Sequence, residues 1–126
     1  MNRRRTTPEE RRRALRAGRR AETLAALFLM ARGWRILARD WRCKSGEIDL
    51  VARRRHIVAF IEVKYRPEPG EAGEAIRPRQ RERILRAAGL FMAGRPALAG
   101  LDIRFDAVLV SPWRLPRHIA DAWRIE

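Results

Sequence analysis

The stretch that decides the fold is residues 46–65, which read GEIDLVARRRHIVAFIEVKY. Residues 47–52 and 57–65 are rich in β-branched and other apolar side chains, a composition that is typical of β-strands. The charged segment 53–56 that joins them is short enough to require antiparallel pairing. The stretch therefore predicts a β-hairpin in the middle of the chain.

Each strand of this hairpin carries one acid at its centre, Asp49 in the first and Glu62 in the second. An ionised carboxylate inside a strand is costly unless it is paired or binds a metal. Adjacent strands lie about 5 Å apart, so a level register would bring the two acids together, and Mg²⁺ (or Mn²⁺) between them would relieve their repulsion. Lys64 shares a strand face with Glu62, where it would stabilise a phosphate or position a water. We therefore predict that Asp49, Glu62 and Lys64 are catalytic residues for metal-assisted phosphodiester cleavage, although Glu62 and Lys64 taken singly also fit solvated positions.

The alternation of strand side chains also predicts which residues face which side of the sheet. We expect Glu47 and Asp49 on one face of the first strand, and Ile48 and Leu50 on the other. Glu47 fits a solvated strand start better than a supporting role at the rim of the site.

A helix is predicted ahead of the hairpin. Leu24, Leu27, Phe28 and Ala31 recur at the spacing of one helix face, and Gly33 is a typical stop. Apolar residues also occupy the other faces of this segment. We therefore expect the helix to be covered on more than one side.

The remaining segments complete an α/β pattern. We expect a short strand over residues 34–37, an irregular basic stretch up to Ser45, a helix from about residues 75–78 to Met92, and a strand over 102–110. The core-facing stripe of this second helix comprises Ile84, Ala88 and Phe91. These elements predict a layered α/β domain with a small mixed sheet flanked by helices.

The composition indicates which class of partner the protein binds and in which compartment it is found. The 126 residues carry a net charge of +14, and residues 1–20 hold nine arginines against two glutamates. Such a charge favours nucleic acid, with an acidic membrane surface as the competitor, and no apolar stretch is long enough to span a bilayer. The single cysteine, Cys43, favours a reducing, cytoplasmic location. We interpret residues 1–12 as a flexible basic arm and residues 13–126 as a single domain.

Two strings carry a family resemblance: GEIDLVA at residues 46–52 and FIEVKYR at residues 60–66. They resemble the signature of the YraN family, small bacterial proteins that are regarded as restriction-endonuclease-like and similar to archaeal Holliday junction resolvases. The resemblance begins at residues 18–22, passes residues 33–37 and continues to residues 104–106. It implies a three-layer restriction-endonuclease-like domain.

The resemblance also implies roles for individual residues. The aspartate and the glutamate of that superfamily bind the divalent metal and the lysine assists the attack, which places these roles on Asp49, Glu62 and Lys64. A metal-organising role falls on a first-helix glutamate, here Glu22. The residues alone leave open whether Glu22 faces inward or lies at a solvated helix start.

Two positions depart from the family pattern. A lysine–glutamine pair is common where this chain has Arg79 and Gln80, and a threonine is frequent where it has Tyr65. Gln80 points along the core-facing stripe of the second helix. Asp106 shares a strand face with Arg104, which favours a structural ion pair over catalysis.

Other polar and aromatic residues receive weaker interpretations. His56 and His118 have no partner at a metal-ligand spacing, and the four tryptophans fit core or lid positions better than base-stacking platforms. Nucleic-acid contacts are predicted for Arg3, Arg4, Arg5, Arg11, Arg12, Arg13, Arg42, Lys44, Arg79 and Gln80.

The sequence therefore predicts a nucleic-acid-binding protein, a metal-dependent endonuclease acting on structured or branched DNA. The alternative is a non-catalytic DNA- or RNA-binding protein that retains the nuclease fold. A ribosome-associated or membrane-surface basic protein is a further alternative. Branched-DNA cleavage usually needs two sites, which makes a homodimer attractive.

Overall fold

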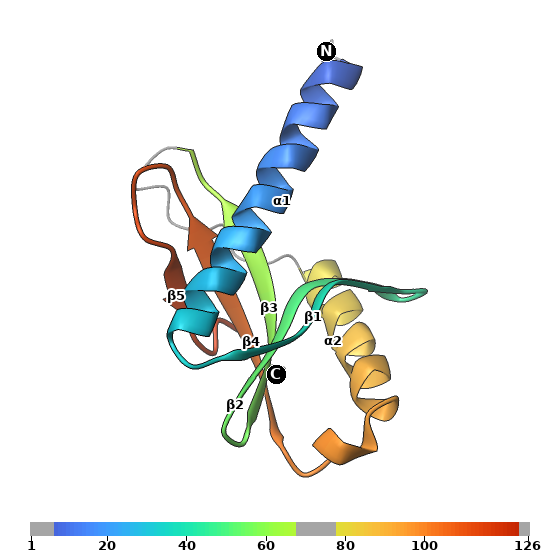
Figure 1. Cartoon of the computed structure of the whole chain (residues 1–126). Coiled ribbons are helices and arrows are strands. Elements are labelled where there is room, and N and C mark those ends of the chain that lie inside the picture. Colours follow the sequence, from blue (N-terminus) through green and yellow to red (C-terminus); the bar gives the residue numbers. More distant parts are fainter. Residues whose placement is uncertain (1–6, 68–77, 124–126) are drawn as a thin grey trace.

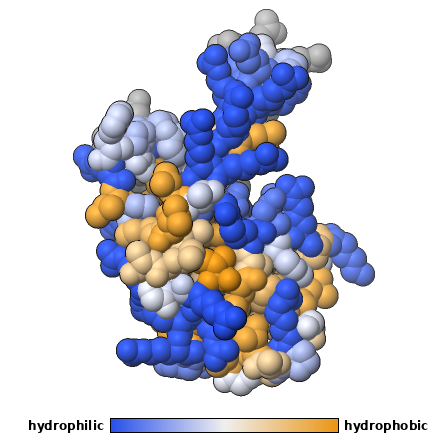
Figure 2. Space-filling view, viewed as in Figure 1, coloured by the Kyte–Doolittle hydropathy of each residue, from blue (hydrophilic) through white to orange (hydrophobic). Residues whose placement is uncertain are grey.

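Helix α1 begins at a capping box and extends well beyond the sheet. The computed structural model describes residues 7–67 and 78–123. The Thr7 hydroxyl accepts a hydrogen bond from the Glu10 backbone N–H (3.1 Å), and the Glu10 carboxylate accepts one from the Thr7 N–H (2.9 Å). The helix runs over Pro8–Ala31, so residues 8–12 of the predicted arm are helical, while residues 1–6 lie outside the described part. Its N-terminal half projects past the sheet (Figure 1), and most of the side chains on it are hydrophilic (Figure 2).

Only one face of α1 packs on the sheet. Its buried residues are Ala21, Ala25, Ala26 and Leu29. Leu24 and Leu27, which the spacing placed on the core face, are 50% and 57% exposed. The prediction of a helix covered on more than one side is therefore wrong. The reason is that small alanine side chains let the backbone approach the sheet closely, and nothing among the described residues packs on the outer face.

The sheet has five strands in the order β1-β2-β3-β4-β5. Neighbouring strands are antiparallel except for β3 and β4, which are parallel and joined through α2. The predicted hairpin, second helix and 102–110 strand are all confirmed. The elements after α1 are β1 (Arg35–Cys43), β2 (Gly46–Arg54), β3 (Ile57–Tyr65), α2 (Pro78–Ala93), the 3₁₀ helix η1 (Pro96–Leu98), β4 (Asp102–Val110) and β5 (Arg117–Ile119).

Strand β1 corrects a second prediction. The stretch up to Ser45 was expected to be irregular after a short strand, but β1 pairs with β2 along its whole length. The pairing register shifts between Ile36 and Ala38, and Asp40 has a positive φ of 46°. A bulge of this kind changes the alternation of side chains within the strand, which hides the strand from a pattern search. β5 was not predicted.

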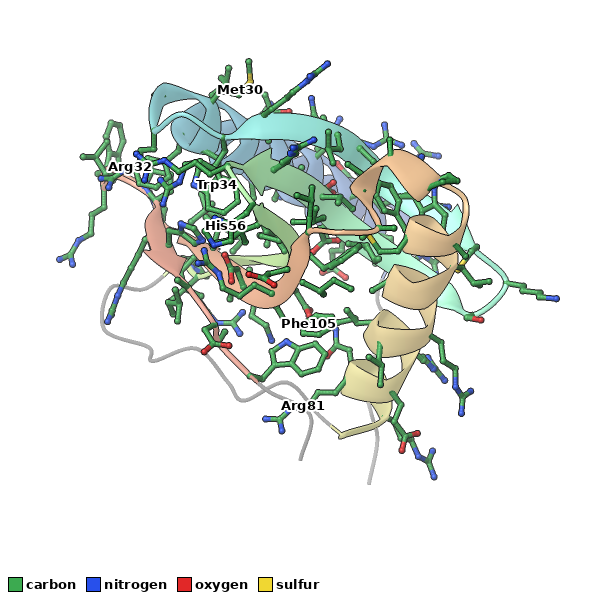
Figure 3. All side chains as sticks on the ribbon, turned by 90° about the horizontal axis from the view of Figure 1, so that it is seen from below. Met30, Arg32, Trp34, His56, Arg81 and Phe105 are labelled. Atoms are coloured by element: carbon green, nitrogen blue, oxygen red, sulfur yellow. The ribbon has the colours of Figure 1, made fainter. Side chains whose placement is uncertain are left out.

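Two apolar cores separate the sheet from its helices. On the α2 side, Phe60 packs with Phe91 and Phe105. On the α1 side, Leu29 and Trp34 pack against the opposite face of the sheet. Figure 3, which views the domain from below, shows Trp34 and Phe105 on these opposite sides. The domain thus has the three layers that were expected, with the sheet in the middle. Within the described residues, no helix carries an apolar run of the length that a bilayer span requires.

Candidate metal-binding site

Asp49 lies at an irregularity of strand β2, where the usual alternation of side chains between the two faces of the sheet is interrupted. Ile48 belongs to the core on the α2 side, whereas Leu50 belongs to the core on the α1 side. The expectation that these two residues share a face is therefore wrong. The β2–β3 ladder ends at the pair Leu50 and Ile61. Beyond it, the Asp49 carboxylate accepts a hydrogen bond from the Val63 backbone N–H at 2.8 Å. The aspartate thus takes the place of a backbone carbonyl at the end of the ladder.

Glu62 lies on β3 beside this position and is held by one residue of α2. The side-chain amide of Gln80 donates a 2.6 Å hydrogen bond to Glu62 Oε1. The second carboxylate oxygen, Oε2, is buried and has no hydrogen-bond partner among residues 7–67 and 78–123. Buried polar atoms are nearly always paired, so an unpaired carboxylate oxygen at this position is unusual and is available as an acceptor or ligand. Gln80, which is also a predicted nucleic-acid contact, thus bonds to the site carboxylate.

Burial perturbs both carboxylates in the same direction. It raises the pKa of Asp49 to about 7, against the lowering effect of the Val63 N–H and with a further raising effect of the Glu62 charge. Burial also raises the pKa of Glu62, while the Lys64 charge and the Gln80 hydrogen bond lower it. Because the ionised forms of both carboxylates are disfavoured, a cation bound between them would stabilise those forms.

Glu22 reaches toward this pair from α1. Its side chain is partly buried, and burial followed by the Asp40 charge raises its pKa. The Glu22 charge in turn contributes to the raised pKa of Asp49. Its partial burial and its effect on Asp49 favour the inward-facing orientation over a solvated helix start. Yet within residues 7–67 and 78–123 no three Asp, Glu, His or Cys side chains are grouped closely enough to hold a metal.

Lys64 occupies the predicted place at the end of β3. Its side chain is partly buried, and it is paired in register with Leu109 of β4. Its ammonium group is close enough to Glu62 to lower the pKa of that acid. The two carboxylates and the lysine therefore come together across β2 and β3.

The site opens into a hollow between the sheet and α2. The cavity has a volume of about 450 Å³. At its rim, Arg42 pairs with Asp40 and Glu47 at 3.3 and 3.4 Å, and all three side chains are largely exposed. The polar residues that line it are Arg42, Glu47, Asp49, Glu62, Gln80, Arg83 and Asp106.

Most of the predicted nucleic-acid contacts lie on the surface. The side chains of residues 11–13 are exposed on the projecting half of α1. Arg42 and Lys44 are exposed at the β1–β2 turn, and Arg79 is exposed at the start of α2. Residues 3–5 lie outside the described part of the chain.

Asp106 confirms the prediction of a structural ion pair and adds a partner that was missed. It is fully buried and accepts two hydrogen bonds from Arg104, at 2.8 and 2.9 Å. His118 Nε2 lies 2.7 Å from the same carboxylate, and the Asp121 N–H donates to it at 2.8 Å. Burial alone would raise the pKa of Asp106, but these hydrogen bonds lower it. No sequence signal links Asp106 to His118, because strand β5 that carries the histidine was not predicted.

Taken together, these features define a three-layer α/β domain with two partly buried carboxylates that line a cavity and a lysine near one of them. The model of the family described as "Uncharacterised protein family UPF0102" matches residues 21–110. The chain therefore belongs to UPF0102, the YraN family that its sequence resembles.

Relatives within this family match most of the chain. A UPF0102 protein from Paramagnetospirillum magneticum is 55% identical over 117 residues, covering 90% of this chain and 91% of the relative. Others from Parvibaculum lavamentivorans and Rhodopseudomonas palustris are 52% and 51% identical, and the matches cover 88% and 87% of this chain and 84% and 85% of those relatives.

Proposed function

We propose that this protein is a metal-dependent phosphodiesterase that acts on structured or branched DNA. The observation that carries the proposal is the vacant, buried Oε2 atom of Glu62 next to Asp49, whose pKa is raised to about 7. At neutral pH, a cation between the two carboxylates would offset their mutual repulsion and favour their ionised forms. A pure phosphate-binding surface gains nothing from two inward-facing carboxylates.

The donor set fits a hard divalent cation. Asp49 and Glu62 supply oxygen ligands, and Glu22 adds negative charge from α1. Mg²⁺ is commonly bound by one or two carboxylates and keeps several waters and a substrate phosphate as its other ligands. When bound, such an ion polarises a phosphoryl oxygen and lowers the pKa of a water. Two protein carboxylates are therefore sufficient for this type of site.

The chain's own residues do the positioning. Gln80 fixes the Glu62 carboxylate through Oε1, which leaves Oε2 available as a ligand that a cation would take. The Val63 N–H fixes Asp49 in the same way. The Nζ atom of Lys64 would stabilise negative charge on the phosphate or orient the attacking water. The surrounding arginines of a chain with net charge +14 would hold the phosphate backbone without reading sequence.

A cleavage panel tests the proposal. Branched, flapped, single-stranded and duplex DNA would be incubated with the protein and Mg²⁺ or Mn²⁺. We expect cleavage of the branched or flapped substrates, and a loss of about 100-fold or more in Lys64→Ala. Arg86→Ala removes one positive charge from an exposed position of α2 and is the matched control. A wild-type protein that binds these substrates without cutting any of them would instead be a non-catalytic DNA-binding protein.

A further inference from the structure

The loop between β4 and β5 presents a tryptophan entirely to solvent. Trp113 is fully exposed (relative accessibility 103%), whereas Trp34 and Trp123 are buried and Trp41 is partly buried. Trp113 is therefore not a core residue, which leaves the lid position of the two that were expected. Its backbone has a φ of 63°, a conformation that bulky side chains rarely adopt. The fold thus presents the indole to solvent, although burial of this group would be favourable.

The loop stands at the same end of the sheet as the acidic site. β3 and β4 are parallel and in register, so Lys64 is paired with Leu109 and Tyr65 with Val110. The Arg66 N–H also donates to the Val110 carbonyl at 2.8 Å. Trp113 follows three residues after Val110, beyond the ends of both strands, and this end of the sheet also faces the projecting half of α1 (Figure 1).

The neighbours of the indole suit a polyanion. Arg114 and Arg117 both follow Trp113, in the loop and at the first residue of β5, and both are exposed. Neither forms an ion pair among residues 7–67 and 78–123. Leu115, two residues after Trp113, is 81% exposed. An exposed aromatic ring with arginines close by in the sequence is an arrangement by which proteins stack single-stranded bases while holding the backbone.

We propose that Trp113 is a stacking platform for an unpaired base of the nucleic acid that enters the acidic site. This inference rests on the proposed function and specifies its substrate class. Bases in continuous duplex are stacked on each other and offer no free face, so the platform favours strands that are single, flapped or branched near the cut. At about 3.3 Å per residue and 5 Å between strands, Trp113 lies within about 18 Å of Lys64. That distance corresponds to about five stacked nucleotides or fewer.

The test measures binding in EDTA, so that cleavage plays no part. Fluorescence anisotropy would compare wild type, Trp113→Ala and Trp113→Phe on a labelled single strand, on the same strand with abasic residues, and on duplex. We expect Trp113→Ala to lose about 5- to 100-fold in affinity for the single strand, and less than about twofold for duplex. Trp113→Phe should retain most of the affinity, and the abasic strand should not distinguish the variants. Leu115→Ala controls for the loss of apolar surface alone.

Specific outcomes would overturn the proposal. It fails if Trp113→Ala binds the single strand with the affinity of wild type, or if its affinities for single strand and for duplex fall by the same factor. It also fails if wild type does not bind the single strand. A loss of binding to anionic phosphatidylserine vesicles, with strand binding unchanged, would assign the loop to a membrane surface instead. Because the site carboxylates are intact in Trp113→Ala, a separate failure of metal binding would refute the nuclease proposal and leave the stacking result standing.

Discussion

Replacing Asp49 by asparagine should stabilise the fold at alkaline pH when no metal is present. The pKa of Asp49 is raised from 3.8 to about 7 in the folded protein, chiefly by burial. Its folded state therefore holds a proton that the unfolded state releases, and the resulting stability is present below about pH 4 and is lost as the pH rises toward 7. The difference between the two pKa values corresponds to about 4 kcal/mol. Partial solvent access reduces the expected gain to about 2–4 kcal/mol.

The assay is urea unfolding in EDTA at pH 4, 6 and 8. The free energy of unfolding of Asp49→Asn should exceed that of wild type at pH 8, and the two should converge at pH 4. Glu82→Gln removes the same charge from an exposed position of α2 and should change stability by less than about 0.5 kcal/mol. If Asp49→Asn were less stable than wild type at pH 8, or if the difference did not depend on pH, burial would not disfavour the ionised form of Asp49.

Three further variants test residues that support the site, the basic helix α1 and the buried ion pair of Asp106. Gln80→Ala should lower affinity for Mn²⁺ by about 10-fold or more, measured by calorimetry, because Glu62 loses the partner that orients it; an unchanged affinity would make Gln80 dispensable. Changing residues 11–13 to glutamine should flatten the salt dependence of DNA binding by up to about 3 in the log–log slope, and an identical slope would remove α1 from the interface. Asp106→Asn should cost about 3–5 kcal/mol of stability in urea unfolding, since it leaves Arg104 without its buried partner; a cost below about 1 kcal/mol would refute that role.

The hairpin could be predicted because its signals are local. Two apolar runs, a short charged turn and an acid in each strand are enough to pair β2 with β3 and to place Asp49 near Glu62. The partnership of Asp106 with Arg104 was also predictable, since residues two apart on a strand share a face. These inferences need only the period of a strand.

The wrong predictions concern segments in which packing interrupts the regular alternation of side chains. The bulge in β1 and the change of face between Ile48 and Leu50 shift the alternation, and neither leaves a local mark in the sequence. On α1, the larger leucines were expected to face the core, but the close approach of helix and sheet admits alanines such as Ala25 instead. The bond between Gln80 and Glu62 depends on how α2 crosses the sheet, which a single sequence does not specify.

The central claim is that Asp49 and Glu62 together hold a divalent cation. Isothermal titration calorimetry with Mn²⁺ at pH 8, where Asp49 is ionised, tests it most directly. Wild type and Glu82→Gln should each bind one ion per chain, and the double variant Asp49→Asn/Glu62→Gln should bind none. Wild type that takes up no Mn²⁺, or a double variant that binds it with unchanged affinity, would contradict the account.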